Sequence, residues 1–167
     1  GAYAGTEVDE TGDYNLTPIN GALSASDGTN QSFKTNDSTA YALSYGSSFN
    51  TVLNGSHTQL FLYKPNSLTP TNPDALCGVL TSGGNYGYNI WRRNNKLRLY
   101  VLINGVNQVT ESLSSLSALN ADLYIGARNR VQNGSIDILS DGSFGDHILM
   151  PRILTAQEKT NLLNYFV

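Results

Sequence analysis

The stretch from Tyr86 to Ile103, YGYNIWRRNNKLRLYVLI, decides the fold class, because apolar and polar residues alternate on both sides of a two-residue turn signal. With Asn94 and Asn95 at the turn, the two halves pair as an antiparallel hairpin in which Trp91 lies opposite Arg98. The side chains then divide between two faces of a sheet, because successive residues of a strand point to opposite sides. The pattern therefore predicts a sheet protein.

One face of this hairpin is apolar, and we expect it to be the core, while the mixed face looks outward. The side chains expected in the core are Tyr86, Tyr88, Ile90, Leu97, Leu99, Val101 and Ile103. The side chains expected on the outward face are Trp91, Tyr100, Arg98, Arg93, Asn89 and Lys96.

The rest of the chain repeats short alternating segments between Asn-Gly, Asp-Gly and Gly-Gly turn signals. Only 14% of the 167 residues are charged, and 50 are Asn, Ser or Thr, which excludes a coiled coil and favours a turn-rich β protein. We expect one domain over residues 1–167, an all-β antiparallel β-sandwich. Strands are expected at 32–35, 41–44, 58–64, 76–82, 86–93, 96–103, 106–111, 121–128, 134–139 and 143–150.

A single short C-terminal helix is expected from Thr155 to Phe166. Thr155 is positioned to cap its first turn, and Glu158, three residues later, is positioned to bond back to the cap amide. Leu162, Leu163 and Phe166 form an apolar stripe, which we expect to dock on the sandwich.

Four segments occur in the order DGTN (27–30), FLYKP (61–65), LYIGAR (123–128) and FGDHILMPRILTAQE (144–158). In this order they resemble strands and the closing helix of laminin G-like domains, which belong to the concanavalin A-like lectin and glucanase superfamily. The chain departs from the family pattern at Tyr63, where tryptophan is usual, and at 144–146, where Ile-Asp-Glu is usual. The resemblance implies a concanavalin A-like sandwich with jelly-roll topology, a fold that hosts lectins, adhesion modules and glycosidases.

The outward face of the hairpin has the composition of a sugar-binding platform. The C–H face of a sugar packs on an aromatic ring while its hydroxyls bond guanidinium and amide groups. We therefore predict a ligand site at Trp91, Tyr100, Arg98, Arg93 and Asn89 for a cell-surface or environmental glycan. The alternative is a solvated sheet face on which Trp91 covers the stems of the arginines.

The residues needed for catalysis are missing or poorly placed, so we expect no enzyme. The related glucanases carry an E-x-D-x-x-E motif with two catalytic carboxylates. In this chain Glu7 and Asp9 match it, but Gly12 stands where the second glutamate should be. His57 and His147 lie in no nucleophile-elbow pattern. Cys77 lies in an apolar strand, where a thiol forms little thiolate.

A calcium site is one interpretation of Asp137, Asp141 and Asp146, which cluster within ten residues. Carboxylates on loops are Ca²⁺ ligands, although this spacing is not that of an EF-hand. The alternative is that these residues form turns through side-chain bonds to their own backbone. No other cofactor is expected.

The formal net charge of −3 argues against a nucleic-acid partner, and the absence of a long apolar run argues against membrane insertion. A single cysteine excludes a disulfide framework. We expect a non-catalytic carbohydrate-binding module of a larger extracellular, cell-surface or virion protein, such as a phage fibre or spike used in host attachment, with homo-oligomerisation through the parent protein. The alternative function is a structural or protein-binding sandwich, a spacer or an oligomerisation cap, without glycan binding.

Overall fold

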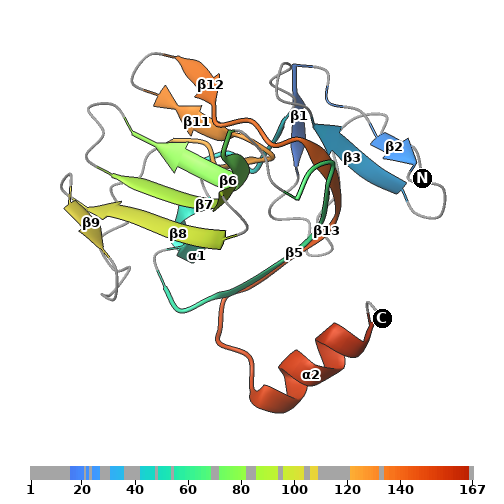
Figure 1. Cartoon of the computed structure of the whole chain (residues 1–167). Helices are drawn as coiled ribbons and strands as arrows, with labels where there is room; N and C mark the ends of the chain where they lie inside the picture. Colours follow the sequence, from blue (N-terminus) through green and yellow to red (C-terminus); the bar gives the residue numbers. More distant parts are fainter. Residues whose placement is uncertain are drawn as a thin grey trace.

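The computed structural model describes residues 16–20, 22, 24–26, 31–35, 42–47, 49–53, 55–68, 72–81, 86–93, 96–103, 106–108, 121–131 and 134–165. In this part of the chain the strands form two sheets that are almost entirely antiparallel, which confirms the all-β prediction (Figure 1). Among the same residues, no helix is long and apolar enough to cross a lipid bilayer.

The larger sheet contains the hairpin predicted for residues 86–103. Its strands lie in the order β1 (Thr17–Ile19), β4 (Ala42–Ser44), β10 (Tyr124–Ile125), β6 (Asp74–Leu80), β7 (Gly87–Arg93), β8 (Lys96–Ile103) and β9 (Val106–Gln108). Beside this path, β11 (Arg128–Arg130) runs parallel to β6 and pairs with β12 (Ser135–Asp137). A four-residue helix, α1 (Asn50–Leu53), follows β4.

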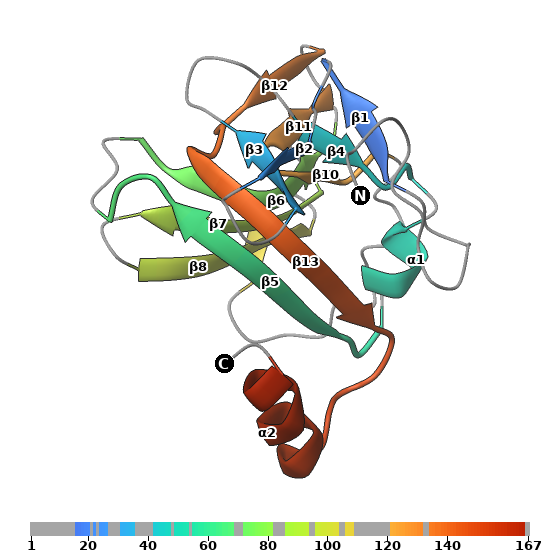
Figure 2. The same ribbon diagram turned by 90° about the vertical axis from the view of Figure 1, so that its right-hand side faces the viewer.

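The smaller sheet has the order β2 (Ser24–Ser26), β3 (Gln31–Thr35), β13 (Gly142–Met150) and β5 (Thr58–Pro65). Its two long strands, β5 and β13, cross the inner face of the larger sheet (Figure 2). A register shift between Phe144 and His147 interrupts their pairing.

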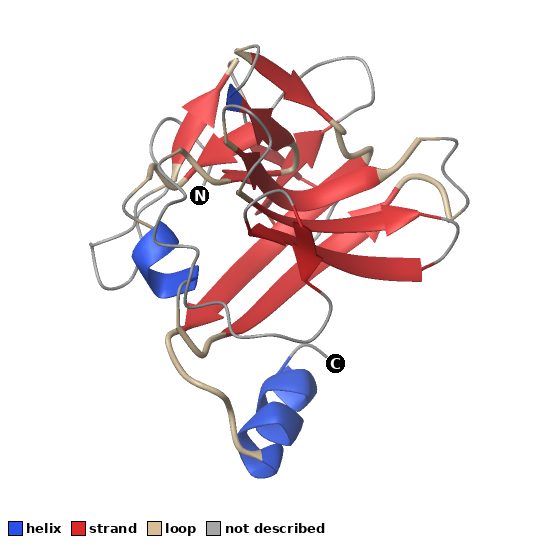
Figure 3. Cartoon of the chain, turned by 90° about the vertical axis from the view of Figure 1, so that its left-hand side faces the viewer, coloured by secondary structure: helices blue, strands red, loops and turns tan. Residues whose placement is uncertain are grey.

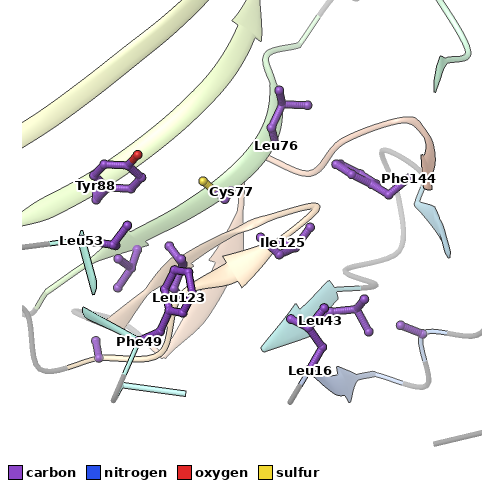
Figure 4. Packing of buried hydrophobic residues seen from close by; sticks show 13 residues of the cluster. Leu16, Leu43, Phe49, Leu53, Leu76, Cys77, Tyr88, Leu123, Ile125 and Phe144 are labelled. Atoms are coloured by element: carbon purple, nitrogen blue, oxygen red, sulfur yellow. The ribbon is translucent and has the colours of Figure 1, made fainter. Parts of the chain in front are cut away.

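The buried core lies between the two sheets (Figure 4). The larger sheet supplies Leu43, Cys77 and Tyr88, while Phe144 comes from the smaller sheet, and each of these side chains is at most 3% exposed. Phe49 joins the cluster from the turn before α1. The described core cluster therefore draws side chains from both sheets.

The expected strands agree with the observed ones most closely in the hairpin, where β8 has the expected limits. The strand expected at 121–128 is divided into β10 and β11, because Gly126 adopts a φ of 84° and turns the chain between them. β1, β2 and α1 were not expected. The expected strand at 106–111 is confirmed to Gln108, and its remainder lies outside the described residues.

The C-terminal helix is confirmed as α2 (Ala156–Tyr165), and its capping box is present. The Glu158 amide donates to Thr155 Oγ1 at 3.3 Å, and the Thr155 amide donates to Glu158 Oε2 at 2.9 Å. The expected docking is wrong for Leu163, which is 59% exposed. Figure 3 shows the reason: α2 lies beyond the ends of the long strands and covers neither sheet, while Phe166 lies outside the described residues.

Candidate functional site

The β7–β8 hairpin brings together most of the predicted ligand-binding residues in the expected register. Trp91 pairs with Arg98, Asn89 with Tyr100, and Arg93 with Lys96. The described side chains of Trp91, Arg98, Asn89, Arg93 and Lys96 therefore share one face of the sheet, because alternate positions of paired strands point the same way.

Trp91 is partly buried, and its indole nitrogen is inaccessible to solvent. A ligand on this face would therefore meet ring carbons of Trp91 rather than its N–H group. Contact through ring carbons is the mode in which a sugar ring packs on an aromatic side chain.

Three cationic side chains lie beside Trp91 on the same face. Arg93, Lys96 and Arg98 are all exposed. Within the part of the chain that the structure describes, none of the three forms an ion pair. The strands that carry them, β7 and β8, contain no acidic residue. The face thus combines an aromatic surface with planar hydrogen-bond donors that no described carboxylate occupies.

Asn89 departs from the prediction, because its side chain is only 2% exposed. The residue beside it in the ladder is Gly78, and a Cβ atom at that position would lie 2.6 Å from Asn89 Oδ1. The amide therefore occupies the space over Gly78, where the backbone of Arg128 also approaches. Both polar atoms of this amide are buried and have no hydrogen-bond partner among the described residues, so Asn89 packs within the sheet face instead of meeting a ligand.

The predicted core face of the hairpin is confirmed in part. Tyr88 is buried and donates a hydrogen bond of 2.9 Å to Gln59 of β5, and Ile90 packs against the core. Leu97 and Leu99 were expected in the core but are 68% and 58% exposed. The smaller sheet packs on β7 through β5 and does not cover β8, the next strand, so Leu97 and Leu99 stay exposed.

The side chains of Tyr100, Val101 and Ile103 lie outside the described part of the structure, although their backbone belongs to β8. Tyr100 therefore stays a predicted ligand contact on the evidence of register alone.

A buried ion pair fixes the other face of the hairpin, and the sequence analysis missed it. Arg92 binds Asp74, whose side chain is 0% exposed, through both Nε and Nη2. Tyr63 donates to the same carboxylate at 3.3 Å, and burial followed by the charge of Asp74 raises the pKa of this phenol. Arg92 also donates to the carbonyls of Ser67 and Leu68, so the cluster anchors the loop before β6. The sequence did contain a signal for this pair. By strand alternation Arg92 falls on the core face, and a buried arginine needs an acidic partner.

The carboxylates proposed for calcium do not assemble as a cation site among the described residues. Both oxygens of Asp137 accept 2.7 Å bonds from Arg128, which does not fit a calcium ligand. Asp141 Oδ1 accepts a hydrogen bond from the side chain of Asn66, which follows β5, so this contact is not the bond to its own backbone that the turn-forming alternative expects. The side chain of Asp146 lies outside the described residues.

Of the residues weighed for catalysis, Cys77, His147 and His57 lie in the core or beside it, and Glu7 and Gly12 lie outside the described residues. Burial raises the pKa of the Cys77 thiol to about 12, so almost no thiolate exists at neutral pH. His147 is hydrogen-bonded through Nδ1 to the Tyr45 hydroxyl and stacks on Phe61, with ring centroids 4.4 Å apart. His57 bonds the carbonyl of Gly55.

Comparison of the chain with protein-family models, with curated proteins and with solved structures gives no significant match. The site must therefore be interpreted from its own geometry.

Proposed function

We propose that this domain is a non-catalytic carbohydrate-binding module that attaches a larger extracellular, cell-surface or virion protein to a glycan. The observation that carries the proposal is the register of β7 and β8, which sets Trp91 beside exposed Arg93 and Arg98. The resemblance of four segments to laminin G-like domains is compatible with this proposal, because the fold that it implies hosts lectins and adhesion modules as well as glycosidases.

The chemistry of the face suits a saccharide. A pyranose ring that covers Trp91 buries its C–H face on the indole, and its hydroxyls accept bonds from the guanidinium groups of Arg93 and Arg98. These groups are exposed, so water competes for every hydrogen bond. One stacked ring with two or three such bonds gives a Kd near the millimolar range.

Weak binding of this kind serves adhesion only when several copies act together. Display of several domains on one fibre or surface raises the avidity by about two to four orders of magnitude without a new contact. We therefore propose that the parent protein presents the domain in multiple copies.

Binding of the domain, displayed on beads, to a glycan array tests the proposal. Trp91→Ala should abolish binding while circular dichroism shows a folded protein, because Trp91 lies outside the cluster of buried core residues. Leu97→Ala is the matched control, since Leu97 lies on the same hairpin, on the opposite face, and is 68% exposed. If the Trp91 variant binds as the parent does, the proposed face is wrong.

One observation favours the second candidate, a structural or protein-binding module. Leu97 and Leu99 together expose an apolar strip on the inner side of β8, where a second protein could pack. Binding to no glycan, together with loss of self-association or partner association in Leu97→Asp, would favour this function.

A further inference from the structure

We propose that the glycan recognised by the Trp91 face carries a sugar carboxylate, which Arg93 and Arg98 bind together. This inference rests on the proposed glycan-binding function and specifies the chemical class of the sugar.

The distribution of ion pairs over the arginines of the chain gives the first argument. The sequence contains six arginines, and four of them pair with a carboxylate. The pairs are Arg92 with Asp74, Arg128 and Arg130 with Asp137, and Arg152 with Glu158. The two that form no ion pair with any described residue are Arg93 and Arg98, and both flank the tryptophan.

The second argument is the mutual repulsion of the cations on this face. Arg93 lies directly opposite Lys96, and Arg98 occupies the next position on the same side of β8. Like charges directly opposite each other destabilise a sheet. The chain as a whole is acidic, with a formal charge of −3, so this concentration of positive charge is a local feature. A bound anion would relieve the repulsion.

The register also permits both arginines to reach one anion. Arg93 and Arg98 are diagonal neighbours, a relation that separates two residues by about 7–8 Å and their Cβ atoms by somewhat less. Guanidinium groups on such long side chains can converge on a single carboxylate, whose two oxygens match their planar forks. Trp91 is two residues from Arg93 and directly across from Arg98, so a ring stacked on the indole presents its carboxylate to both. Three cations on an acidic domain are too few for a nucleic-acid backbone.

A paired glycan panel tests the inference with the full chain displayed on beads. Each glycan that contains a hexuronate or a sialate is compared with its carboxyl-reduced, neutral counterpart. We expect at least one acidic glycan to bind roughly tenfold or more tightly than its reduced partner, and added salt to weaken this preference. Arg93→Gln and Arg98→Gln should each remove most of the preference. Arg152→Gln is the control, because this exposed arginine pairs with Glu158 beside α2 and should leave binding unchanged.

The outcomes separate the inference from the function on which it depends. Equal binding of acidic and reduced glycans overturns the carboxylate and leaves glycan binding in place. Binding to no member of the panel or the wider array overturns both. A carboxylate preference that survives in both Arg93→Gln and Arg98→Gln overturns the assignment to these residues.

Discussion

Lowering the pH from 7 to 5 should destabilise the fold through His147, a histidine of β13 that stays neutral in the native state. Its ring stacks on Phe61, its Nδ1 is hydrogen-bonded to the Tyr45 hydroxyl, and its Nε2 is buried with no partner in the part of the chain that the structure describes. Burial lowers the pKa of His147 to about 3. In the unfolded chain the pKa returns to about 6.5.

The sign of the effect follows from where protons bind. Above pH 6.5 the histidine is neutral in both states, so the full stability is present. As the pH falls below 6.5, the unfolded state binds a proton at His147 that the native state does not bind. The free energy of unfolding then decreases by up to about 1.4 kcal/mol per pH unit, and the loss reaches about 2 kcal/mol at pH 5. The decrease continues until the pH approaches the native pKa of about 3.

Urea unfolding at several pH values between 7 and 5 measures this loss. His147→Gln should remove most of the pH dependence in that range, whatever its absolute stability. His57→Gln, which replaces the other histidine, should retain it. Hydrogen bonds from Arg152 and Thr155 lower the pKa of Glu158 to about 2, so its contribution is lost only below its ordinary pKa of 4.5 and does not enter this window.

Two results would refute the argument. One is a stability that does not change between pH 7 and 5 in the parent protein. The other is a proton NMR titration in which the ring signals of His147 shift near pH 6.5 in the folded state. The second measurement needs no variant, so the prediction stays testable even if His147→Gln does not fold.

Three further changes test the packing. Arg92→Met should reduce the free energy of unfolding by about 3–5 kcal/mol in urea, because the buried Asp74 carboxylate loses its counter-ion. Thr155→Ala should cost about 1 kcal/mol in α2 and raise its amide exchange about fivefold, because the helix loses its cap. Gly142→Ala should cost about 1–3 kcal/mol by thermal unfolding, since its Cβ would lie 2.5 Å from the Lys64 carbonyl oxygen.

Each of these changes has a control elsewhere in the chain. Arg98→Met removes an exposed arginine and should change stability by less than about 0.5 kcal/mol. Thr160→Ala lies inside α2 and should not speed exchange, because alanine has the higher helix propensity. Gly55→Ala meets no atom within 4 Å and should be tolerated. Equal effects in a variant and its control would contradict the cause assigned to that variant.

The hairpin register could be predicted because its determinants are local. The Asn94-Asn95 pair is a turn signal in the sequence, and alternation on both sides of it allows one strand pairing that puts Tyr88 inward. The capping box at Thr155 is local in the same sense, with its two partners three residues apart.

The extent of the core could not be predicted, because it depends on how far a second sheet reaches. Leu97 and Leu99 have the parity of core residues, but β5 covers β7 and stops short of β8. The burial of Asn89 depends on Gly78 of the preceding strand, β6, and on Arg128, which is distant in sequence. Neither relation can be deduced from the alternation within one strand, since each is set by contacts between strands.

The adjacent residues Arg92 and Arg93 depend both on local strand alternation and on contacts with other strands. They have the same chemistry, and strand parity sends them to opposite faces of β7. Arg92 meets a buried carboxylate, so its charge is neutralised within the fold, whereas Arg93 stays exposed beside Trp91. Removing the first charge should therefore reduce stability, and in those molecules that remain folded the glycan affinity should persist. Removing the second should reduce affinity at unchanged stability, and if both substitutions gave the same result, the division of the hairpin into a structural face and a ligand face would be wrong.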